Sequence, residues 1–101
     1  MNKSRRQELR NLTRGIHNVS DSDGLNDCIN TLENILWDEQ NYYDNIPENL
    51  QYSQRAETSE EAIEKIEEAL ECLQEALNCE DKYDFIGYIK EAIDFINDAI
   101  F

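Results

Sequence analysis

The 101-residue sequence is poor in the residue types that build metal sites, disulfide frameworks and tight turns. His17 is the only histidine, so there is no second imidazole for a metal and no Glu-x-x-His pair for a di-iron site. Three cysteines without Cys-x-x-Cys spacing fit neither a disulfide framework nor a zinc site, and we expect reduced thiols. We therefore expect no metal and no other cofactor.

Long apolar runs are also missing. No segment approaches the roughly 20 apolar residues of a membrane-spanning helix, and the first residues lack the apolar segment of a secretory signal. With three glycines and one proline, the chain is neither collagen-like nor linker-like. These absences predict a cytoplasmic protein that does not enter a membrane.

Positive charge is scarce, because 9 Lys and Arg residues stand against 23 Asp and Glu residues, for a net charge of -14. Nucleic-acid backbones and anionic membranes carry the same sign, which argues against direct binding to either. Five basic residues and one glutamate within residues 1–14 give that segment a charge of +4, which leaves -18 for the rest. The expected partner is a basic protein.

Apolar residues at alternating spacings of three and four predict four amphipathic helices. The first runs over about residues 5–18 and the second over about 25–43; the third begins at Thr58 or slightly earlier, and the fourth follows Asp81. The clearest stripe runs from Ile63 to Leu77, with an alanine beside it once per heptad, and a similar stripe runs from Ile86 to Ile100. Thr58 begins a capping-box pattern for the third helix, and Asp81 is a good N-cap for the fourth. The polar segment between these two helices predicts a tight antiparallel hairpin.

Four such helices cannot bury their stripes separately, so the sequence predicts an all-α fold, an antiparallel helical bundle that forms one domain over residues 1–101. The alternative is a longer helical hairpin that completes its core by forming a homodimer. Pro47 interrupts the helical pattern, and we expect an ordered loop over about residues 44–57.

Two patterns that resemble functional sites have simpler explanations. Asp21 and Gly24 lie in a stretch that looks like a calcium loop, but Val19 and Asn30 would then occupy positions that require carboxylates. Helix capping is the preferred interpretation. Nothing in the sequence indicates an orienting group or a substrate pocket for His17, so we expect a protein without enzymatic activity.

The third helix carries an unusual density of carboxylates. Like charges four residues apart each destabilise a helix by about 0.2–0.5 kcal/mol. The array spans roughly 22 Å, or about one charge per 3 Å, which is close to the ~3.4 Å between phosphates of one DNA strand. The helix either imitates a phosphate backbone or is an ordinary solvated helix, and the charge of -18 favours the first interpretation. The seven carboxylates are those of Glu60, Glu61, Glu64, Glu67, Glu68, Glu71 and Glu75.

Aromatic and basic residues give further candidates. Trp37, Tyr42 and Tyr43 lie among acidic residues near the proline loop, as in interfaces that receive Arg or Lys, although they could instead cover the end of the bundle. Basic residues recur every four positions along the first helix, and we interpret them as neutralising the protein's own acidic surface rather than as a nucleic-acid site. This basic stripe comprises Arg6, Arg10 and Arg14. Cys72 and Cys79 are expected on the outward side of the third helix, beside the carboxylates, where negative charge raises a thiol pKa.

The segment from Trp37 to Glu71 resembles a group of small, uncharacterised Glu-rich helical proteins of Firmicutes phages and mobile elements. The resemblance lies in Tyr43-Asp44-Asn45, in Pro47-Glu48-Asn49-Leu50-Gln51 and in the Glu-Glu-Ala-Ile type repeats from Glu60 onward. It covers about the middle third of the chain. The resemblance implies a phage protein in the cytoplasm of a bacterial host, where small acidic proteins often act stoichiometrically against nucleases or immunity complexes, some of them as DNA mimics.

Two functions follow as expectations. The first is a non-enzymatic inhibitor that binds a basic, nucleic-acid-handling defence factor of the host through the third helix, Trp37, Tyr42 and Tyr43. The second is a structural module that self-associates through its apolar, alanine, cysteine and aromatic residues.

Overall fold

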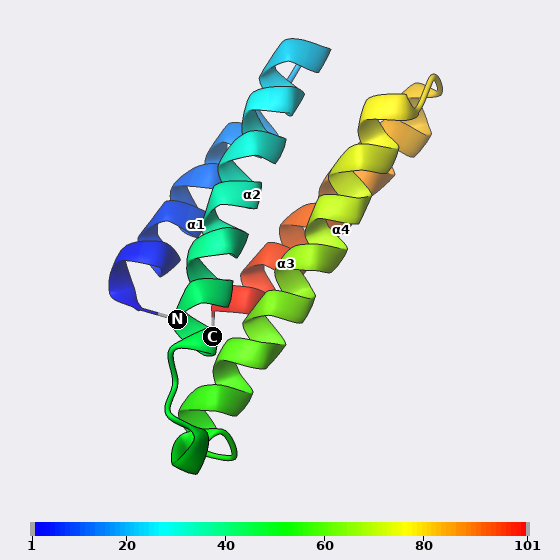
Figure 1. Cartoon of the computed structure of the whole chain (residues 1–101). Coiled ribbons are helices and arrows are strands. Elements are labelled where there is room, and N and C mark those ends of the chain that lie inside the picture. Colours follow the sequence, from blue (N-terminus) through cyan, green and yellow to red (C-terminus); the bar gives the residue numbers. More distant parts are fainter. Residues whose placement is uncertain (1, 101) are drawn as a thin grey trace.

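The computed structural model describes residues 2–100, which form four α-helices joined by short connections (Figure 1). Helix α1 spans Lys3–His17, α2 spans Ser22–Asp44, α3 spans Gln54–Asn78 and α4 spans Lys82–Ile100. Helix α1 packs against α2 and α4, and α3 packs against the same two helices. The predicted all-α antiparallel bundle is confirmed.

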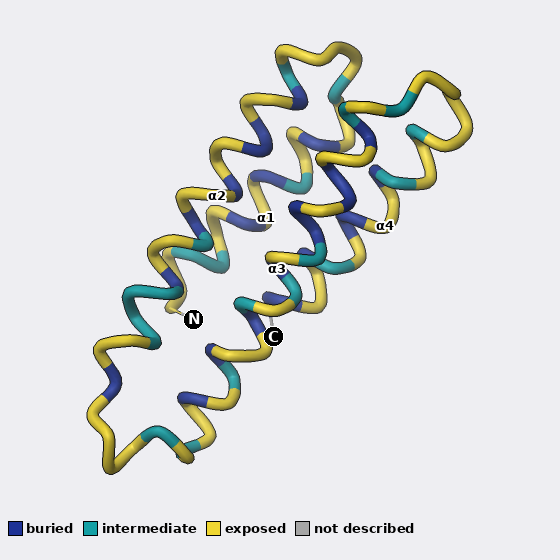
Figure 2. Tube along the Cα trace, turned by 45° about the vertical axis from the view of Figure 1, so that its right-hand side comes forward, coloured by how far each residue is buried: buried dark blue, intermediate teal, exposed yellow. Residues whose placement is uncertain are grey.

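The predicted apolar stripes face one another along the bundle axis (Figure 2). Leu9 and Ile16 of α1, Leu32 of α2, Leu73 of α3 and Ile96 of α4 are all shielded from solvent. Each stripe is covered by helices of the same chain, so a second copy is not required to complete the core. The stripe ends are less buried than predicted, because Ile63 and Leu77 are half-buried and Ile86 is exposed.

The alanines that were expected beside the stripes lie in the core instead. Ala69 and Ala92 are fully buried, and α3 and α4 make the most extensive helix–helix contact in the bundle. Small side chains let two helix backbones approach closely, and a wide buried face suits a helix that has two neighbours.

Polar side chains begin the helices as the capping rules predict. Asp21 accepts a hydrogen bond from the Gly24 amide, in agreement with the capping interpretation of that stretch. Asp81 accepts from the amides of Tyr83 and Asp84 at the start of α4. The expected capping box at Thr58 is wrong: Ser53 caps α3 one turn earlier, by accepting from Ala56 N, and the Thr58 hydroxyl donates to the Gln54 carbonyl inside the helix.

Helices α2 and α3 are longer than their neighbours and extend past α1 and α4 at the end that carries the proline loop (Figure 1). The loop contains a short 3₁₀ helix, η1, at Glu48–Leu50, which follows Pro47. The Gln51 side chain donates to the Ile46 carbonyl and ties the loop together. Ile46 and Ala56 are buried at this end, outside the main apolar cluster.

Candidate functional site

The outward side of α3 forms an acidic face, defined here by the seven glutamates from Glu60 to Glu75. At about 100° of rotation per residue, they fall within about a third of the helix circumference, opposite the buried Ile66 and Leu73. Six of the seven are exposed and Glu68 is half-buried. Within residues 2–100, the one ion pair that involves this face joins Glu68 to Lys65 at 3.7 Å. The protein's own arginines do not neutralise the acidic face.

The acidic face continues into a groove between α3 and α4, called here the α3–α4 groove, with a volume of about 400 Å³. Its wall contains four carboxylates and two aromatic rings, and no basic side chain lines it. Its residues are Glu68, Glu71, Cys72, Glu75, Tyr88, Glu91 and Phe95. A cation of the chain already contacts two of these residues. Lys65 Nζ lies 5.6 Å from the centre of the Phe95 ring and also forms an ion pair with Glu68.

Negative charge in this groove changes the acidity of its two weakly acidic groups. The Glu75 carboxylate is the largest influence that raises the pKa of Tyr88, followed by burial. Burial, then the charge of Glu91, raises the pKa of Cys72 to about 11. The Cys72 thiol donates a long hydrogen bond of 3.7 Å to Glu91 Oε2. The carboxylate contributions to both shifts show that this groove disfavours a further negative charge.

The predicted outward position of the two cysteines is corrected by the structure. Cys72 is buried, because α4 packs against the side of α3 on which it lies. Cys79 is half-buried and caps the end of α3 rather than lying on its outer side. The raised pKa of Cys72 agrees with expectation, but burial is the largest single cause, ahead of the charge of Glu91.

The predicted aromatic residues lie on α2, away from the α3–α4 groove. Trp37 is 63% exposed, and Tyr42 and Tyr43 are half-buried. The guanidinium carbon of Arg5 lies 5.2 Å from the centre of the Tyr42 ring, so this ring already receives an arginine of its own chain. Of the three, Trp37 offers the most surface to a partner.

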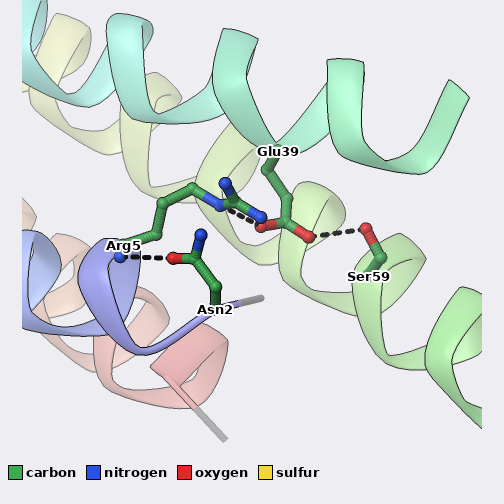
Figure 3. A network of polar contacts seen from close by, with 4 residues as sticks. All are labelled: Asn2, Arg5, Glu39 and Ser59. Carbon is green, nitrogen blue, oxygen red and sulfur yellow. Dashed lines mark hydrogen bonds and ion pairs between the residues drawn. The ribbon is translucent and has the colours of Figure 1, made fainter. Parts of the chain in front are cut away.

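Sequence reasoning missed a buried polar network between α1, α2 and α3 (Figure 3). Glu39, one of the acidic residues close in sequence to Trp37 and Tyr42, has 0% exposure. Its Oε1 accepts from Arg5 Nε at 2.8 Å, and its Oε2 accepts from the Ser59 hydroxyl at 2.6 Å. The sequence did contain a signal that Glu39 is buried. Glu39 follows Leu32 and Ile35 at the spacings of three and four residues that define the apolar stripe.

The basic stripe was interpreted as neutralising the protein's own acidic surface, but its arginines form no ion pair within residues 2–100. Arg10 and Arg14 are exposed and Arg6 is half-buried. Among residues 2–100, the ion pairs are Arg5 with Glu39 and Lys65 with Glu68, and neither includes a member of the stripe. Arg5, which lies outside the stripe, is the arginine that forms an ion pair within this part of the chain.

Comparison of the chain with protein-family models, with curated proteins and with solved structures found no match. The resemblance to Glu-rich phage proteins therefore stays a prediction. Within residues 2–100, none of the helices combines the length and the hydropathy of a membrane-spanning segment. The same residues contain no group of three or more side chains that could hold a metal ion.

Proposed function

We propose that this protein is a non-enzymatic acidic protein that binds a basic protein partner through the acidic face of α3 and the α3–α4 groove. The observation that carries the proposal is the set of seven carboxylates that the chain's own arginines leave unpaired. Like-charge repulsion along α3 costs stability, and a cationic partner would relieve it.

The groove suits lysine and arginine side chains in particular. A partner's ammonium or guanidinium group placed near Phe95 or Tyr88 would contact both a ring and carboxylates, as Lys65 does at the rim. Long-range attraction would speed association, and salt would weaken it steeply. Trp37 would add apolar contact if the partner extends to α2.

The finer proposal is a stoichiometric inhibitor of a host nuclease or bacterial immunity complex. The acidic face has about one charge per 3 Å, near the ~3.4 Å phosphate spacing of a DNA strand. A groove that normally holds nucleic acid would therefore accept α3 in its place, as a DNA mimic. A phage protein that acts in the bacterial cytoplasm fits this role.

The test compares two triple variants that each remove three negative charges. One neutralises the acidic face with Glu64→Gln, Glu67→Gln and Glu71→Gln. The control neutralises exposed acids of α2 and α4 with Glu33→Gln, Asp94→Asn and Asp98→Asn. Each protein is immobilised and exposed to a bacterial lysate, and mass spectrometry identifies what is captured.

We expect the unmodified protein and the control to capture the same nucleic-acid-binding protein, and the acidic-face variant to lose it. Added duplex DNA should displace the captured protein. Equal capture by both variants would contradict binding through the acidic face. Capture that DNA does not displace would contradict mimicry. Sedimentation at several salt concentrations tests the alternative, a self-associating module, which predicts a salt-insensitive oligomer.

A further inference from the structure

A second pocket, on a different side of the molecule, has the opposite charge. It lies where the start of α1, the last turns of α2 and the start of α3 meet, and its volume is about 460 Å³. We call it the two-arginine pocket. Its lining consists of Asn2, Arg6, Tyr42, Gln54, Arg55 and Thr58.

The lining contains two guanidinium groups and no carboxylate, in a chain whose net charge is -14. Within residues 2–100, neither Arg6 nor Arg55 forms an ion pair. Arg6 Nε is shielded from solvent and has no hydrogen-bond acceptor. A buried donor without an acceptor destabilises the folded state, and more so when it is charged. The Arg6 guanidinium therefore has hydrogen-bonding capacity that the described chain does not use.

Two helices begin at this pocket and add to its positive potential. Asn2 is the N-cap of α1, and Gln54 and Arg55 are the first two residues of α3. The first amides of a helix have no acceptor within the helix, and the helix dipole places partial positive charge there. Both effects favour an anion, and they act together with the two arginines.

The nearby negative charge is already compensated. Glu39 lies three residues before Tyr42, outside the lining, and is bonded to Arg5 and Ser59. The charge of Arg5 is compensated by Glu39. Like Arg6 Nε, the Arg5 Nη2 atom is shielded from solvent and has no hydrogen-bond acceptor. Arg6 and Arg55 are left to attract a ligand.

We propose that the two-arginine pocket binds a small phosphate monoester. Guanidinium groups bind phosphate oxygens through paired hydrogen bonds, and two of them match the roughly -1.5 to -2 charge of a monoester at neutral pH. The cavity falls within the 300–1,000 Å³ typical of small-molecule sites and leaves room for an organic group beside the phosphate.

This site is separate from the proposed partner surface. Arg55 lies eleven residues before Ile66, about three helical turns, and so shares the inward side of α3, opposite the acidic face. Loss of phosphate binding would leave the proposed function untouched, and the reverse also holds.

The experiment is an NMR titration of ¹⁵N-labelled protein that follows the arginine Nε–H signals, in phosphate-free buffer with about 0.15 M NaCl to screen long-range repulsion. The probes are phenyl phosphate, inorganic phosphate and acetate. We expect saturable shifts of the Arg6 and Arg55 signals with phenyl phosphate, weaker binding of inorganic phosphate and the weakest binding of acetate. Arg10, which is exposed one turn further along α1, serves as the internal reference and should not shift.

Arg6→Gln and Arg55→Gln should each weaken phenyl phosphate binding about tenfold or more, because each removes charged hydrogen bonds. Arg10→Gln removes the same charge from the same helix as Arg6 and should change binding less than about twofold. Arg6→Lys keeps the charge without the paired geometry and should give an intermediate loss. Far-UV circular dichroism verifies that each variant remains helical.

Three outcomes would overturn the proposal. Shifts that do not saturate, or that affect Arg10 equally, indicate nonspecific ion attraction. Unchanged binding of phenyl phosphate by helical Arg6→Gln and Arg55→Gln variants would show that the ligand does not bind in the pocket. Equal affinity for inorganic phosphate and phenyl phosphate would show that the site does not recognise the organic group of a phosphate monoester.

Discussion

Glu39 of α2 and Arg5 of α1 form an ion pair at 2.8 Å in which the carboxylate has no solvent exposure. Ser59 of α3 donates to the second carboxylate oxygen at 2.6 Å, so one side chain connects three helices (Figure 3). Removing a carboxylate from water is costly and is tolerated only when charge and hydrogen bonds compensate it. The stability of the bundle therefore depends on this network being complete.

Breaking the pair should destabilise the protein strongly. Arg5→Met leaves the Glu39 charge buried without its guanidinium partner, which typically costs about 3–5 kcal/mol. Urea unfolding followed by circular dichroism measures the loss. The double variant Arg5→Met with Glu39→Met also removes the buried charge, and we expect it to be more stable than Arg5→Met alone. A double variant that is less stable than the single one would show that the charge itself is not the source of the cost.

The start of α3 can be tested by comparing two hydroxyl residues. Ser53→Ala removes the side chain that accepts from Ala56 N and should cost about 1 kcal/mol. Thr58→Ala removes a hydroxyl that donates to a carbonyl within the helix, and alanine has the higher helix propensity, so we expect a smaller loss. Thermal unfolding of the two variants decides between the two cap positions. A larger loss for Thr58→Ala would restore the capping box that the sequence suggests.

Gly87 offers a site for stabilisation. It lies within α4, and an added Cβ there would meet nothing within 4 Å. Gly87→Ala reduces the conformational entropy of the unfolded chain and should raise the free energy of unfolding by about 0.5–1 kcal/mol. Gly24→Ala is the matched control, because its Cβ would lie 3.1 Å from Asp21 Oδ1 and disturb the cap of α2. Equal gains at both positions would contradict this explanation.

The raised pKa of Cys72 predicts a pH dependence with a definite sign. The thiol pKa rises from 9.0 to about 11 on folding, so the folded state holds the proton more tightly than the unfolded state. This contribution to stability is complete below about pH 9 and is lost as pH rises from 9 towards 11. Urea unfolding over that range should show a decline that is smaller in the Cys72→Ala variant, in which the raised pKa of Tyr88 still contributes.

The same burial predicts the order of thiol modification. At about pH 8, iodoacetamide should modify the half-buried Cys79 before Cys72, because Cys72 is buried and its thiolate is scarce. Cleavage after Glu75 separates the two cysteines for mass spectrometry. Glu91→Gln removes a charge that raises the pKa of Cys72 and should speed its modification. Equal rates at Cys72 and Cys79 in the unmodified protein would contradict the assignment.

The four helices could be predicted because their apolar residues keep one spacing over many turns. Residues such as Leu32 and Ile96 recur at three and four positions, and burial of one helix face follows directly from that spacing. Asp81 was recognisable as a cap because it precedes an amphipathic segment. Thr58 was misleading because its spacing to Glu61 satisfies the capping-box pattern in the middle of a helix as well as at its start.

The candidate sites depend on how neighbouring helices align. The spacing of apolar residues along the sequence does not specify that alignment. Cys72 is buried only because α4 covers that side of α3, and Glu91 meets it only at the observed alignment. The acidic face was predictable from α3 alone, whereas the α3–α4 groove and the two-arginine pocket each require several helices. Glu39 has the position of a core residue, but its charge argued for the surface.

The overhang of α2 and α3 beyond α1 and α4 implies that the bundle does not open as a single cooperative unit. At that end the buried Ile46 and Ala56 lie outside the main apolar cluster. Regions with few buried contacts exchange their amide hydrogens through local opening, at a lower free energy than global unfolding. We expect the amides around the proline loop to exchange with deuterium well before those of the middle of α3.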